Sequence, residues 1–541
     1  MSAAPIAERQ IRWGEPAARW VVLATVLGSG LAMLDATVVN VALGRIGEDF
    51  DADLGGLQWT LNGYTLTLAA FILLGGSLSD RLGRRRMFLV GTVWFALASA
   101  LCGLAPNVAV LVTARALQGV GGALLTPGSL AILSASFAPR DRSRAIGAWS
   151  GLGGIAGAAG PFVGGWLIDA WSWRLVFLVN LPLAAVVVAV TLRHVPESRD
   201  PTATGHLDAA GTVLGALGLA GITYASISAG EQGLSATVVA TGVIGLLALI
   251  GFVGVERRSP APLVPPALFR SRQFTATNLV TFTVYAALGS VFFLLVLHLQ
   301  VVAGFSPLVA GSALLPVTAI MLLLSARSGA LAQRIGPRLQ MSVGPLVAAL
   351  GLLLALRVGP GASYWTDVLP AVVVFGLGLA IMVAPLTSAV LAAAPAEHAG
   401  VASGVNNAVA RAAGLLAVAL LPALAGLSGE DYRSATAFSS GFRIAILISV
   451  GLLVAGGLLA VVGVSNDAAR VPSGAGPAGG AKAYEPAGVP EPAGGPKARE
   501  PAGVGGRSAG GKTDLAHCFS CPVDGPHLET VQPARPARGR P

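Results

Sequence analysis

An acidic residue, Asp35, stands inside a long apolar run of the chain, WVVLATVLGSGLAMLDATVVNVAL at 20–43. The run is long enough to cross a bilayer as a helix, which needs about 20 residues at 1.5 Å rise each. A carboxylate in the membrane core costs about 2.5–3.5 kcal/mol on insertion scales, so its presence indicates a functional site. The other acidic residues lie in loops, in tails or at segment edges, as Asp208 and Asp367 do. The chemistry open to Asp35 is to bind and release a proton.

Arg115 is the expected partner of this carboxylate, because it also interrupts an apolar run, LVTARALQGVGGA at 111–123. The two runs cross the membrane in opposite directions, so residue counts place Arg115 about 8 Å and Asp35 about 12 Å from the same surface. Similar depth predicts an ion pair, since a buried guanidinium needs a partner or water. We expect Asp35 and Arg115 to form a proton switch coupled to substrate or conformation. A static structural ion pair is the alternative.

The composition is that of a protein that crosses the membrane many times. Of the 541 residues, 54% are hydrophobic and 11% are charged, whereas soluble proteins carry about 25% charged residues. The 71 glycines suit closely packed membrane helices. The net charge of +9 comes from arginines in short loops, a topological pattern that argues against nucleic-acid binding. The three cysteines give no disulfide framework.

Fourteen apolar segments have the length of a spanning helix. Helix is the only reasonable conformation for them, because lipid offers no partner to an unpaired backbone group and the runs lack the alternation of a β-barrel. In chain order the segments lie at about 20–43, 57–78, 87–105, 110–133, 145–167, 174–192, 209–228, 236–255, 275–300, 307–326, 339–356, 367–391, 401–426 and 442–464.

Arginine is distributed between the loops in a way that predicts the orientation. Every second loop is rich in arginine, and the loops on the other side hold few. The positive-inside rule therefore places the basic loops and both termini in the cytoplasm. Residues 1–19 precede a segment too long for a signal-peptide core, so they are expected to remain as a cytoplasmic N-terminus. The basic loops are those at 81–86, 140–144, 193–199, 257–272 and 327–338.

The chain contains an internal repeat. GSLSDRLGRRR at 76–86 follows the second segment, GALAQRIGPRL at 329–339 follows the tenth, and an Ala-Pro pair follows both the fourth and the twelfth. We therefore predict two six-helix bundles, at 20–192 and 275–464, joined by a linker at 193–274 that contains two extra central helices. Such a plan is typical of transporters, with the substrate site at the interface of the repeats.

Residues 465–541 differ in character from the rest of the chain. They are rich in Gly, Pro and Ala, with EPAG recurring, and are expected to form a disordered cytoplasmic tail. Cys518 and Cys521 form a CxxC preceded by His517, a spacing found in metal sites, but a single motif in such a tail favours reduced thiols. We expect no metal and no other cofactor.

The first copy of the repeated loop resembles the signature loop of the major facilitator superfamily. A glycine in it gives a tight turn that brings two helices together at the cytoplasmic surface, where its charges pair with each other or with the other half. The resemblance implies a gating latch that holds the outward-facing state, and the alternative is a basic loop that serves topology alone. In the second copy Gln333 replaces the aspartate, so a latch there is expected to be weaker. The gating residues would be Gly76, Asp80, Arg81, Gly83, Arg84 and Arg85.

Two helices carry further motifs of this superfamily. The run around Arg115 looks like the proton-coupling arginine motif. GPFVGG, with Gly160, Pro161, Gly164 and Gly165, resembles the antiporter motif of the exporter branches. Its glycines allow close helix packing, and its proline removes a backbone hydrogen bond and kinks the helix. Such a seam seals against proton leak while the halves move, so export is favoured over import.

Two other stretches narrow the resemblance. LDATVVNVAL at 34–43 and WSWRLVFLVNLP at 171–182 look like the first- and sixth-helix patterns of the fourteen-helix drug:proton antiporters, and the resemblance covers about 20–464. It implies an all-α polytopic membrane protein with the major facilitator fold, monomeric and multi-pass in the plasma membrane. It also implies multidrug efflux and antibiotic resistance, in which protons enter through Asp35 while an amphipathic small molecule leaves by alternating access. The chain lacks a phosphate-binding Lys-Ser/Thr loop, so the expected energy source is the proton motive force.

Polar residues within the segments are candidates for the substrate cavity. Arg411 lies in mid-segment and is expected either to face the cavity or to pair with backbone carbonyls. One membrane acid against two membrane arginines argues weakly against dications as substrates. His298, near the outer end of its segment, is expected at the membrane interface. The candidate cavity residues are Asn40, Asn62, Tyr64, Gln118, Asn407 and Arg411.

Other functions stay open at this stage. An exporter of an endogenous metabolite and an importer of the same superfamily share the features above. A membrane-embedded enzyme or receptor is disfavoured, because the sequence has no His/Glu metal cluster, no Ser–His constellation and no sizeable domain outside the membrane.

Overall fold

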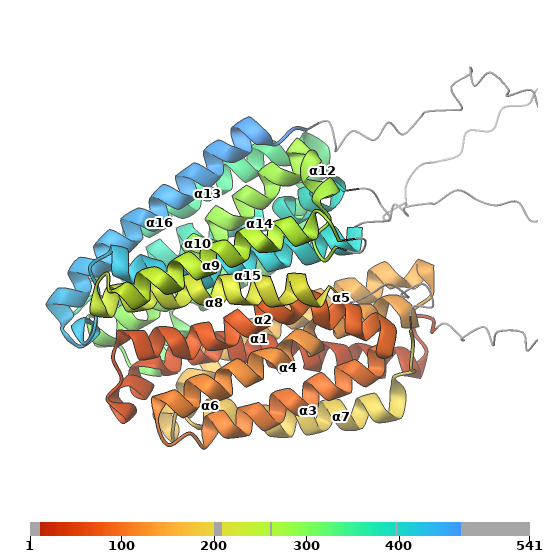
Figure 1. The fold of residues 1–541 in the computed structure, drawn as a ribbon, viewed down its shortest axis with the longest axis horizontal. Helices are drawn as coiled ribbons and strands as arrows, with labels where there is room; N and C mark the ends of the chain where they lie inside the picture. Colours follow the sequence, from red (N-terminus) through yellow and green to blue (C-terminus); the bar gives the residue numbers. More distant parts are fainter. Residues whose placement is uncertain (1–10, 200–207, 260–261, 395–398, 467–541) are drawn as a thin grey trace, which may run out of the picture. The chain divides into compact units, whose positions relative to one another are not determined.

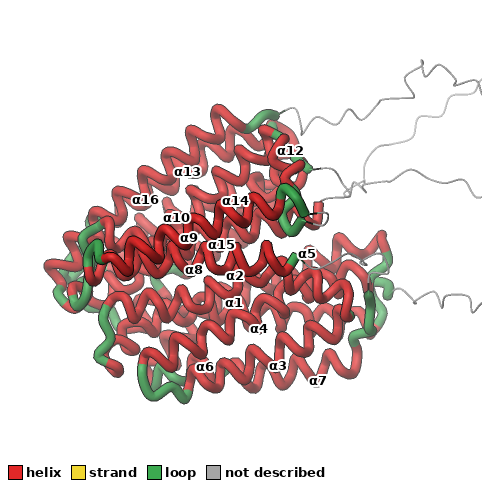
Figure 2. Tube along the Cα trace, viewed as in Figure 1, coloured by secondary structure: helices red, strands yellow, loops and turns green. Residues whose placement is uncertain are grey.

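The computed structural model describes residues 11–199, 208–259, 262–394 and 399–466. Within these ranges the chain is helical and contains no β-strand beyond one isolated bridge between Ile11 and Phe137 (Figure 2). Fourteen helices in this part of the chain are long and apolar enough to cross a membrane. The predicted all-α polytopic membrane fold is thereby confirmed. The predicted tail, from residue 467 on, and its CxxC lie outside the described residues.

Seven helices form the first six spans. Asp53 and Asn107 cap the second and fourth spans, since each side chain accepts a hydrogen bond from a backbone N–H three residues later. The helices extend beyond the predicted segments, because hydrophobicity marks only the part that lipid covers and the caps stand farther out. The bounds are α1 (Pro16–Phe50), α2 (Leu54–Leu82), α3 (Arg84–Gly103), α4 (Val108–Ser136), α5 (Pro139–Ala170), and the pair α6 (Leu175–Leu178) and α7 (Asn180–His194).

The last six spans follow the same order. They are α10 (Arg272–Val301), α11 (Pro307–Ser312) with α12 (Leu315–Ile335), α13 (Pro337–Ala355), α14 (Leu369–Ala392), α15 (Ala399–Leu424) and α16 (Ala435–Gly463). A π-helical turn, Tyr364–Val368, leads into α14, and short 3₁₀ turns lie at Pro266–Arg270 and Asp431–Arg433.

The repeated loops share one backbone turn. Gly83 joins α2 to α3, and Gly336 joins α12 to α13 at the equivalent place in the second set. Both have positive φ, 114° and 86°, a conformation that glycine adopts without the strain of a Cβ atom. The shared geometry supports the internal repeat that the sequence predicts.

Two extra helices, α8 (Ala209–Gln232) and α9 (Ala236–Glu256), lie between the two sets of six in the sequence. α8 packs against α2 of the first set and α15 of the second, so it lies along the seam between them (Figure 1). α9 packs mainly on α8, and it is the least buried of the fourteen described spans. The pair therefore covers the seam from outside and does not separate the two sets.

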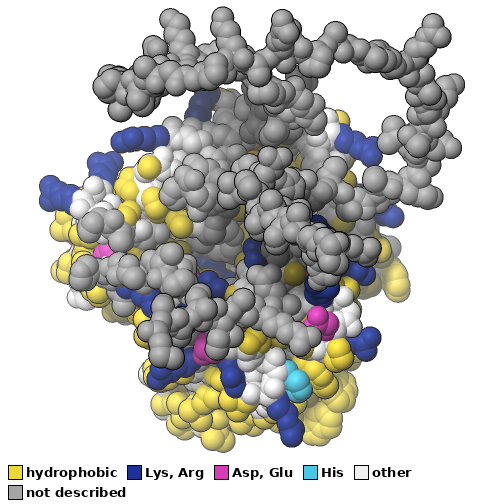
Figure 3. Space-filling model, turned by 90° about the vertical axis from the view of Figure 1, so that its right-hand side faces the viewer, with side chains coloured by type: hydrophobic (Ala, Val, Ile, Leu, Met, Phe, Trp, Pro, Cys, Tyr) yellow, Lys and Arg dark blue, Asp and Glu magenta, His cyan; other side chains and the backbone are white. Residues whose placement is uncertain are grey.

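The arginine-rich loops all lie at one end of the helices, which we call the basic end. It comprises the loops after α2, α4, α7, α9 and α12, and the loops after α1, α3, α5, α8, α10 and α13 lie at the opposite end. Figure 3 shows the basic end, where arginine side chains far outnumber acidic ones on the visible part of the surface.

Candidate functional site

Asp35 of α1 and Arg115 of α4 form an ion pair inside the first set of helices. Both side chains are fully buried, and Nη1 of Arg115 donates to Oδ2 of Asp35 at 2.5 Å. Nε of Arg115 donates to the backbone carbonyl of Thr60 at 3.1 Å, and the guanidinium lies 4.4 Å from the ring centroid of Tyr64. These contacts satisfy the cation away from water. The two charges are thus in the predicted contact, and their role in proton coupling stays a prediction.

Three more polar side chains complete a network around this carboxylate. Gln118 of α4 donates to Oδ1 of Asp35 at 2.8 Å and to Oγ of Ser99 at 2.6 Å. Its own Oε1 accepts from Nη1 of Arg115 at 2.6 Å. Asn180, the first residue of α7, donates to Oδ1 of Asp35 at 3.2 Å and to Ser99 at 3.0 Å. All five side chains are buried. They come from α1, α3, α4 and α7, so four helices hold Asp35 in one hydrogen-bond network.

Sequence analysis does not single out Ser99 or Asn180. Asn180 stands within the sixth-helix pattern at 171–182. A polar residue in that apolar run could have indicated a member of the buried network. Ser99 gives no such signal, because serine is common at the contacts between membrane helices.

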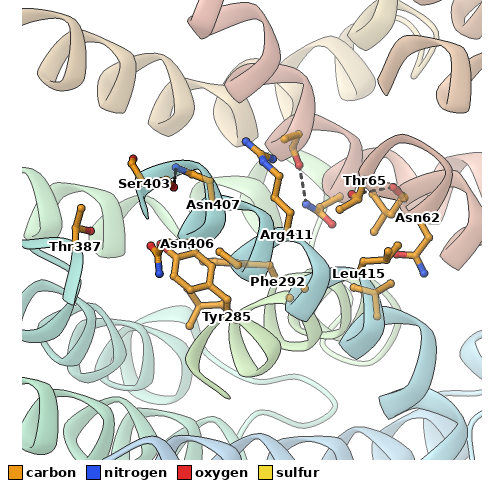
Figure 4. A pocket seen from close by; sticks show the side chains of 18 of the residues that line it. Asn62, Thr65, Tyr285, Phe292, Thr387, Ser403, Asn406, Asn407, Arg411 and Leu415 are labelled. Carbon is orange, nitrogen blue, oxygen red and sulfur yellow. Dashed lines mark hydrogen bonds between the residues drawn. The ribbon is translucent and has the colours of Figure 1, made fainter. Parts of the chain in front are cut away.

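A cavity of about 470 Å³ lies between α1 and α2 on one side and α10, α14 and α15 on the other. Its volume is in the range of sites for drug-sized molecules. The lining begins at Asn62 and Val418, toward the opposite end, and continues to Leu391 and Ser403, about one turn from the basic ends of their helices. Figure 4 shows polar side chains on its walls and the aromatic rings of α10 between them. The cavity is therefore amphipathic and extends to within about one turn of the basic ends of α14 and α15.

Four of the six candidate residues line this cavity: Asn40, Asn62, Asn407 and Arg411.

Tyr64 and Gln118 do not line the cavity, and for them the prediction is wrong. Tyr64 is two residues from Asn62, about 200° around a helix, so it points away from the cavity toward α4 and covers Arg115. Gln118 follows Arg115 by three residues, which puts both on one face of α4 and brings Gln118 into the network.

The second set of helices supplies most of the wall, including side chains that the sequence did not indicate. Tyr285 and Phe292 stand seven residues apart on α10, and Thr387 comes from α14. Aromatic residues in an apolar run give no sign of which face is buried against helices and which lines a cavity. These positions could be recognised only from the packing.

Arg411 faces the cavity and has no hydrogen-bond or ion-pair partner among the described residues. Its Nε is buried, and the side chain rises from α15 toward the helices of the first set (Figure 4). The neighbouring Asn406 instead donates to Asn278 at 3.2 Å and to Thr281 at 2.7 Å. Two orientations of Arg411 were expected, one facing the cavity and one paired with backbone carbonyls, and the structure has the first.

The end opposite the basic end is closed by hydrogen bonds between the two sets of helices. Gln58 of α2 donates to the carbonyls of Val418 and Ala419 at 2.6 and 3.2 Å. Gln300 of α10 donates to the carbonyl of Val41 at 3.0 Å. The backbone N–H of Leu54 donates to Gly429 at 2.8 Å.

A second group of contacts lies at the surface of this closed end. The hydroxyl of Tyr432 donates to the carbonyl of Ala52 at 2.6 Å, and Arg433 pairs with Asp51 at 2.7 Å. Burial raises the pKa of Tyr432, and the hydrogen bond to the Tyr432 hydroxyl raises the pKa of Arg433. Tyr432 therefore keeps its hydroxyl proton, and Arg433 its charge, throughout the ordinary pH range.

His298 lies near this end but is not at the membrane interface, so that prediction is wrong. Its side chain is fully buried, its ring stacks on Phe442 at 3.9 Å, and Nε2 lies 3.0 Å from the carbonyl of Val358. The reason is that α16 and the segment after α13 cover this end of α10.

At the basic end, Asp80, Arg84 and Arg85 of the signature loop contact residues of the first set and of the segment that follows it. Gly76 and Arg81 lie in the last two turns of α2, ahead of the turn at Gly83. Asp80 pairs with Arg84 at 2.8 Å, one helical turn away.

The partners of Arg85 and Arg86 come from the last turn of α7 and from the segment that follows it. Both carboxylate oxygens of Glu197 accept from the backbone N–H groups of Arg85 and Arg86, each at 3.1 Å. The Arg85 side chain donates to the carbonyl of Leu192 at 2.7 Å. Glu197 thus caps the start of α3. No local sequence pattern predicts this contact, because the two positions are more than 100 residues apart.

The glycine-rich motif of α5 lies where the two sets meet. Gly160 and Gly164 pack directly against Thr37 and Val38 of α1. Gly165 packs against the backbone of Leu308 at the start of α11, in the second set, where Asp169 also accepts from the Leu308 N–H at 3.1 Å. Pro161, inside the helix, faces α11 through its carbonyl. The motif therefore brings α1, α5 and α11 into close contact.

Fourteen spanning helices in two repeated sets, with a buried ion-pair network and a cavity between the sets, define a membrane transporter and not an enzyme. Residues 25–418 match the Major Facilitator Superfamily. The chain belongs to this superfamily.

Several relatives have names that refer to drug resistance or export. The chain is 38% identical over 391 residues to the multidrug resistance protein Stp of Mycobacterium tuberculosis, covering 72% of each chain. It is 34% identical over 478 residues to a puromycin resistance protein of Streptomyces alboniger, covering 85% of this chain and 94% of that one. It is 36% identical over 410 residues to the tetracenomycin C resistance and export protein of Streptomyces glaucescens, covering 74% and 75%.

Solved structures share the fold at low sequence identity. A crystal structure of a peptide transporter in complex with sulfate superposes with a TM-score of 0.61 at 17% identity, covering 84% of this chain and 95% of that chain. This likeness establishes the fold alone.

Proposed function

We propose that the protein is a proton-coupled exporter of amphipathic small molecules that works by alternating access in the plasma membrane. The observation that carries the proposal is the buried network around Asp35, which stands one residue along α1 from Ala36 in the cavity wall. A titratable carboxylate with a cationic partner beside a solute cavity is suited to couple protons to transport. The resistance and export names of the relatives support antibiotic efflux.

The orientation that we propose places the basic end and both termini in the cytoplasm, because arginine-rich short loops stay on that side. The cavity extends to within about one turn of the basic ends of α14 and α15, and the opposite end is closed by Gln58, Gln300 and Tyr432. In this orientation the structure is an inward-facing state, ready to take solute from the cytoplasm.

The proton cycle follows from the partners of Arg115. In the inward-facing state Asp35 is ionised and paired, and after the change to the outward-facing state an external proton neutralises it. Arg115 then keeps the Thr60 carbonyl, Gln118 and the Tyr64 ring, so the released cation is not left without partners. Loss of the proton to the cytoplasm restores the pair. Each entering charge supplies about 2.3 kcal/mol per 100 mV of membrane potential.

The moving parts in this proposal are the bundles 20–192 and 275–464, with the linker 193–274 covering their seam. The α5 motif between α1 and α11 would seal that seam during the movement. The loop around Asp80 would bind the second half in the outward-facing state, whereas in this state Asp80 pairs with Arg84 and Arg85 binds Leu192 and Glu197. One chain completes both the network and the cavity, which favours a monomer.

The proposal is tested in inside-out vesicles with an acidic lumen, by recording proton release after addition of lipophilic drugs. The variants are Asp35→Asn and, as a matched control on the same helix, Glu48→Gln, whose exposed pair with Arg45 contributes little. We expect release with the parent and the control and none with Asp35→Asn. Equal release from all three proteins would contradict the role of Asp35. Absence of release from the parent with every drug would contradict antiport.

A further inference from the structure

The charge balance of the cavity is one-sided. Arg411 is the only charged side chain among the described residues that line it, and no aspartate or glutamate shares the wall. Its guanidinium makes no ion pair and no hydrogen bond within the described part of the chain, and its Nε is buried. A cation within a membrane needs a counter-charge or a polar partner. In this state no such partner stands among the described residues.

Arg115 gives the contrast that makes this feature informative. It is bound by Asp35, Gln118 and the Thr60 carbonyl, so the one acid in the membrane core is already engaged. Nothing in the cavity plays the same part for Arg411. The two arginines therefore differ. The hydrogen-bond donors of Arg115 are used by protein groups, whereas the guanidinium of Arg411 is available to a solute in the cavity.

The amide side chains near Arg411 do not fill the gap. Asn406 is held by Asn278 and Thr281, and the amide nitrogens of Asn407 and Asn40 donate to backbone carbonyls of their own helices, at 3.1 and 3.2 Å. These bonds fix the amides in place. They leave Arg411 as the strongest donor that points into the cavity (Figure 4).

The other side chains of the cavity wall indicate the chemistry of the rest of the ligand. Tyr285 and Phe292 lie on one face of α10, seven residues apart, and Leu415 of α15 adds an apolar surface. A flat apolar body fits against these side chains, and an acidic oxygen group on that body reaches the guanidinium with two hydrogen bonds.

We infer that the exported solutes include amphipathic aromatic anions, which bind through a carboxylate, sulfonate or similar acidic group on Arg411. This inference rests on the proposed export function and names its substrate class. It develops the weak argument against dications into a positive preference for anions. Binding in the cavity does not itself require proton coupling, so the two proposals can fail separately.

Two dyes with one aromatic skeleton make the test. Anilinonaphthalene sulfonate carries an acidic group, and N-phenylnaphthylamine is the same body without it. Their equilibrium affinities are measured by fluorescence on the full-length purified protein in detergent, without a proton gradient. The variants are Arg411→Gln, Arg411→Lys and the control Arg443→Gln, which removes an exposed arginine of α16 outside the cavity.

We expect Arg411→Gln to weaken binding of the sulfonate about ten- to hundred-fold, the effect of losing charge-assisted hydrogen bonds. Binding of the neutral dye should change less than about two-fold, Arg411→Lys should retain part of the sulfonate affinity, and Arg443→Gln should retain all of it. Equal loss of both dyes, or unchanged sulfonate binding, would overturn the inference.

A second variant leaves Arg411 in place, in case its removal disturbs the fold. Asn407→Asp puts a carboxylate one helical turn away, where it pairs with Arg411 and competes with the anion. It should reduce sulfonate affinity and spare the neutral dye, and the opposite pattern would contradict the inference. Arginine-dependent binding together with no proton release in the vesicle assay would leave Arg411 as the anion-binding group of the cavity and would remove the exporter proposal.

Discussion

The turn after the second span has the same backbone conformation in both sets, but the residue that caps the next helix is charged in the first set and neutral in the second. After Gly83, the carboxylate of Glu197 accepts from the N–H groups of Arg85 and Arg86, whereas after Gly336 the amide of Asn466 accepts from the N–H of Arg338 at 3.1 Å. Both capping residues come from the segment that follows the last helix of their own set. The repeat thus preserved a structural device and changed its electrostatics.

The same division extends through the two sets. All five members of the network around Asp35 belong to the first set, and the second set supplies Arg411 and the aromatic wall of the cavity. In the loops, the aspartate of the first set is replaced by Gln333 in the second. The comparison teaches that the buried ion pair and most of the cavity wall come from different repeats that share one geometry.

The most severe test of this division replaces each of the two membrane arginines in turn with glutamine. Arg115→Gln leaves the carboxylate of Asp35 buried with no cation, which costs about 3–5 kcal/mol for a broken buried pair. We expect it to abolish drug-driven proton release in vesicles, while Arg411→Gln keeps release driven by a neutral drug. Loss of proton release with both variants would show that the two functions are not separated.

Asn180 sharpens the comparison within the network. Asn180→Leu removes one of the donors to Asp35, and a hydrogen bond to a charged group contributes about 1.5–3 kcal/mol. Proton-coupled efflux should fall about ten-fold or more. Asn406→Leu is the matched change in the second set, and it should alter the apparent drug affinity more than the coupling. The reverse pattern would contradict the assignment.

The paired turns allow a smaller, purely structural test. Glu197→Ala removes two accepted hydrogen bonds and a negative charge at the start of α3, and Asn466→Ala removes one neutral bond at the start of α13. We expect losses of about 1–2 and about 0.5–1 kcal/mol in unfolding free energy. Thermal unfolding of the detergent-solubilised variants gives the order. Equal losses would mean that the charge at the first turn contributes nothing.

The smallest effect is expected at the closed end. The raised pKa of Tyr432 means that its bond to Ala52 contributes fully below the ordinary tyrosine pKa of about 10 and is lost only as pH rises through the higher folded value. Cross-linking of Glu48→Cys with Val301→Cys, which flank this end, should be constant from about pH 6 to 9. Asp51→Asn should change the yield less than about two-fold, because the pair is exposed. A yield that falls steadily over this pH range would contradict this account.

Much of this arrangement was accessible from sequence. Hydropathy located all fourteen spans, and depth counting along two helices brought Asp35 and Arg115 together. Both inferences depend on local and additive quantities, such as residue length and rise per residue. The repeat was equally visible, because Gly83 and Gly336 are demanded by the backbone and so survive in both copies.

What could not be predicted depends on helix rotation and on contacts distant in the chain. Tyr64 and Asn62 are both polar and close in sequence, and only the packing of α2 against α4 decides which one faces the cavity. His298 was misplaced for the same reason, since a neighbouring helix covers it. Glu197 caps a helix that begins more than 100 residues earlier, and no local pattern reports such a contact.

Three contacts of the gate at the closed end have side-chain donors and main-chain acceptors. Gln58, Gln300 and Tyr432 all bind carbonyl oxygens, of Val418, Val41 and Ala52. A carbonyl is present whatever residue occupies the position, so these three acceptor sites can accumulate substitutions without loss of the gate. Because Val418 also lines the cavity, its side chain can change there without removing the carbonyl that Gln58 binds.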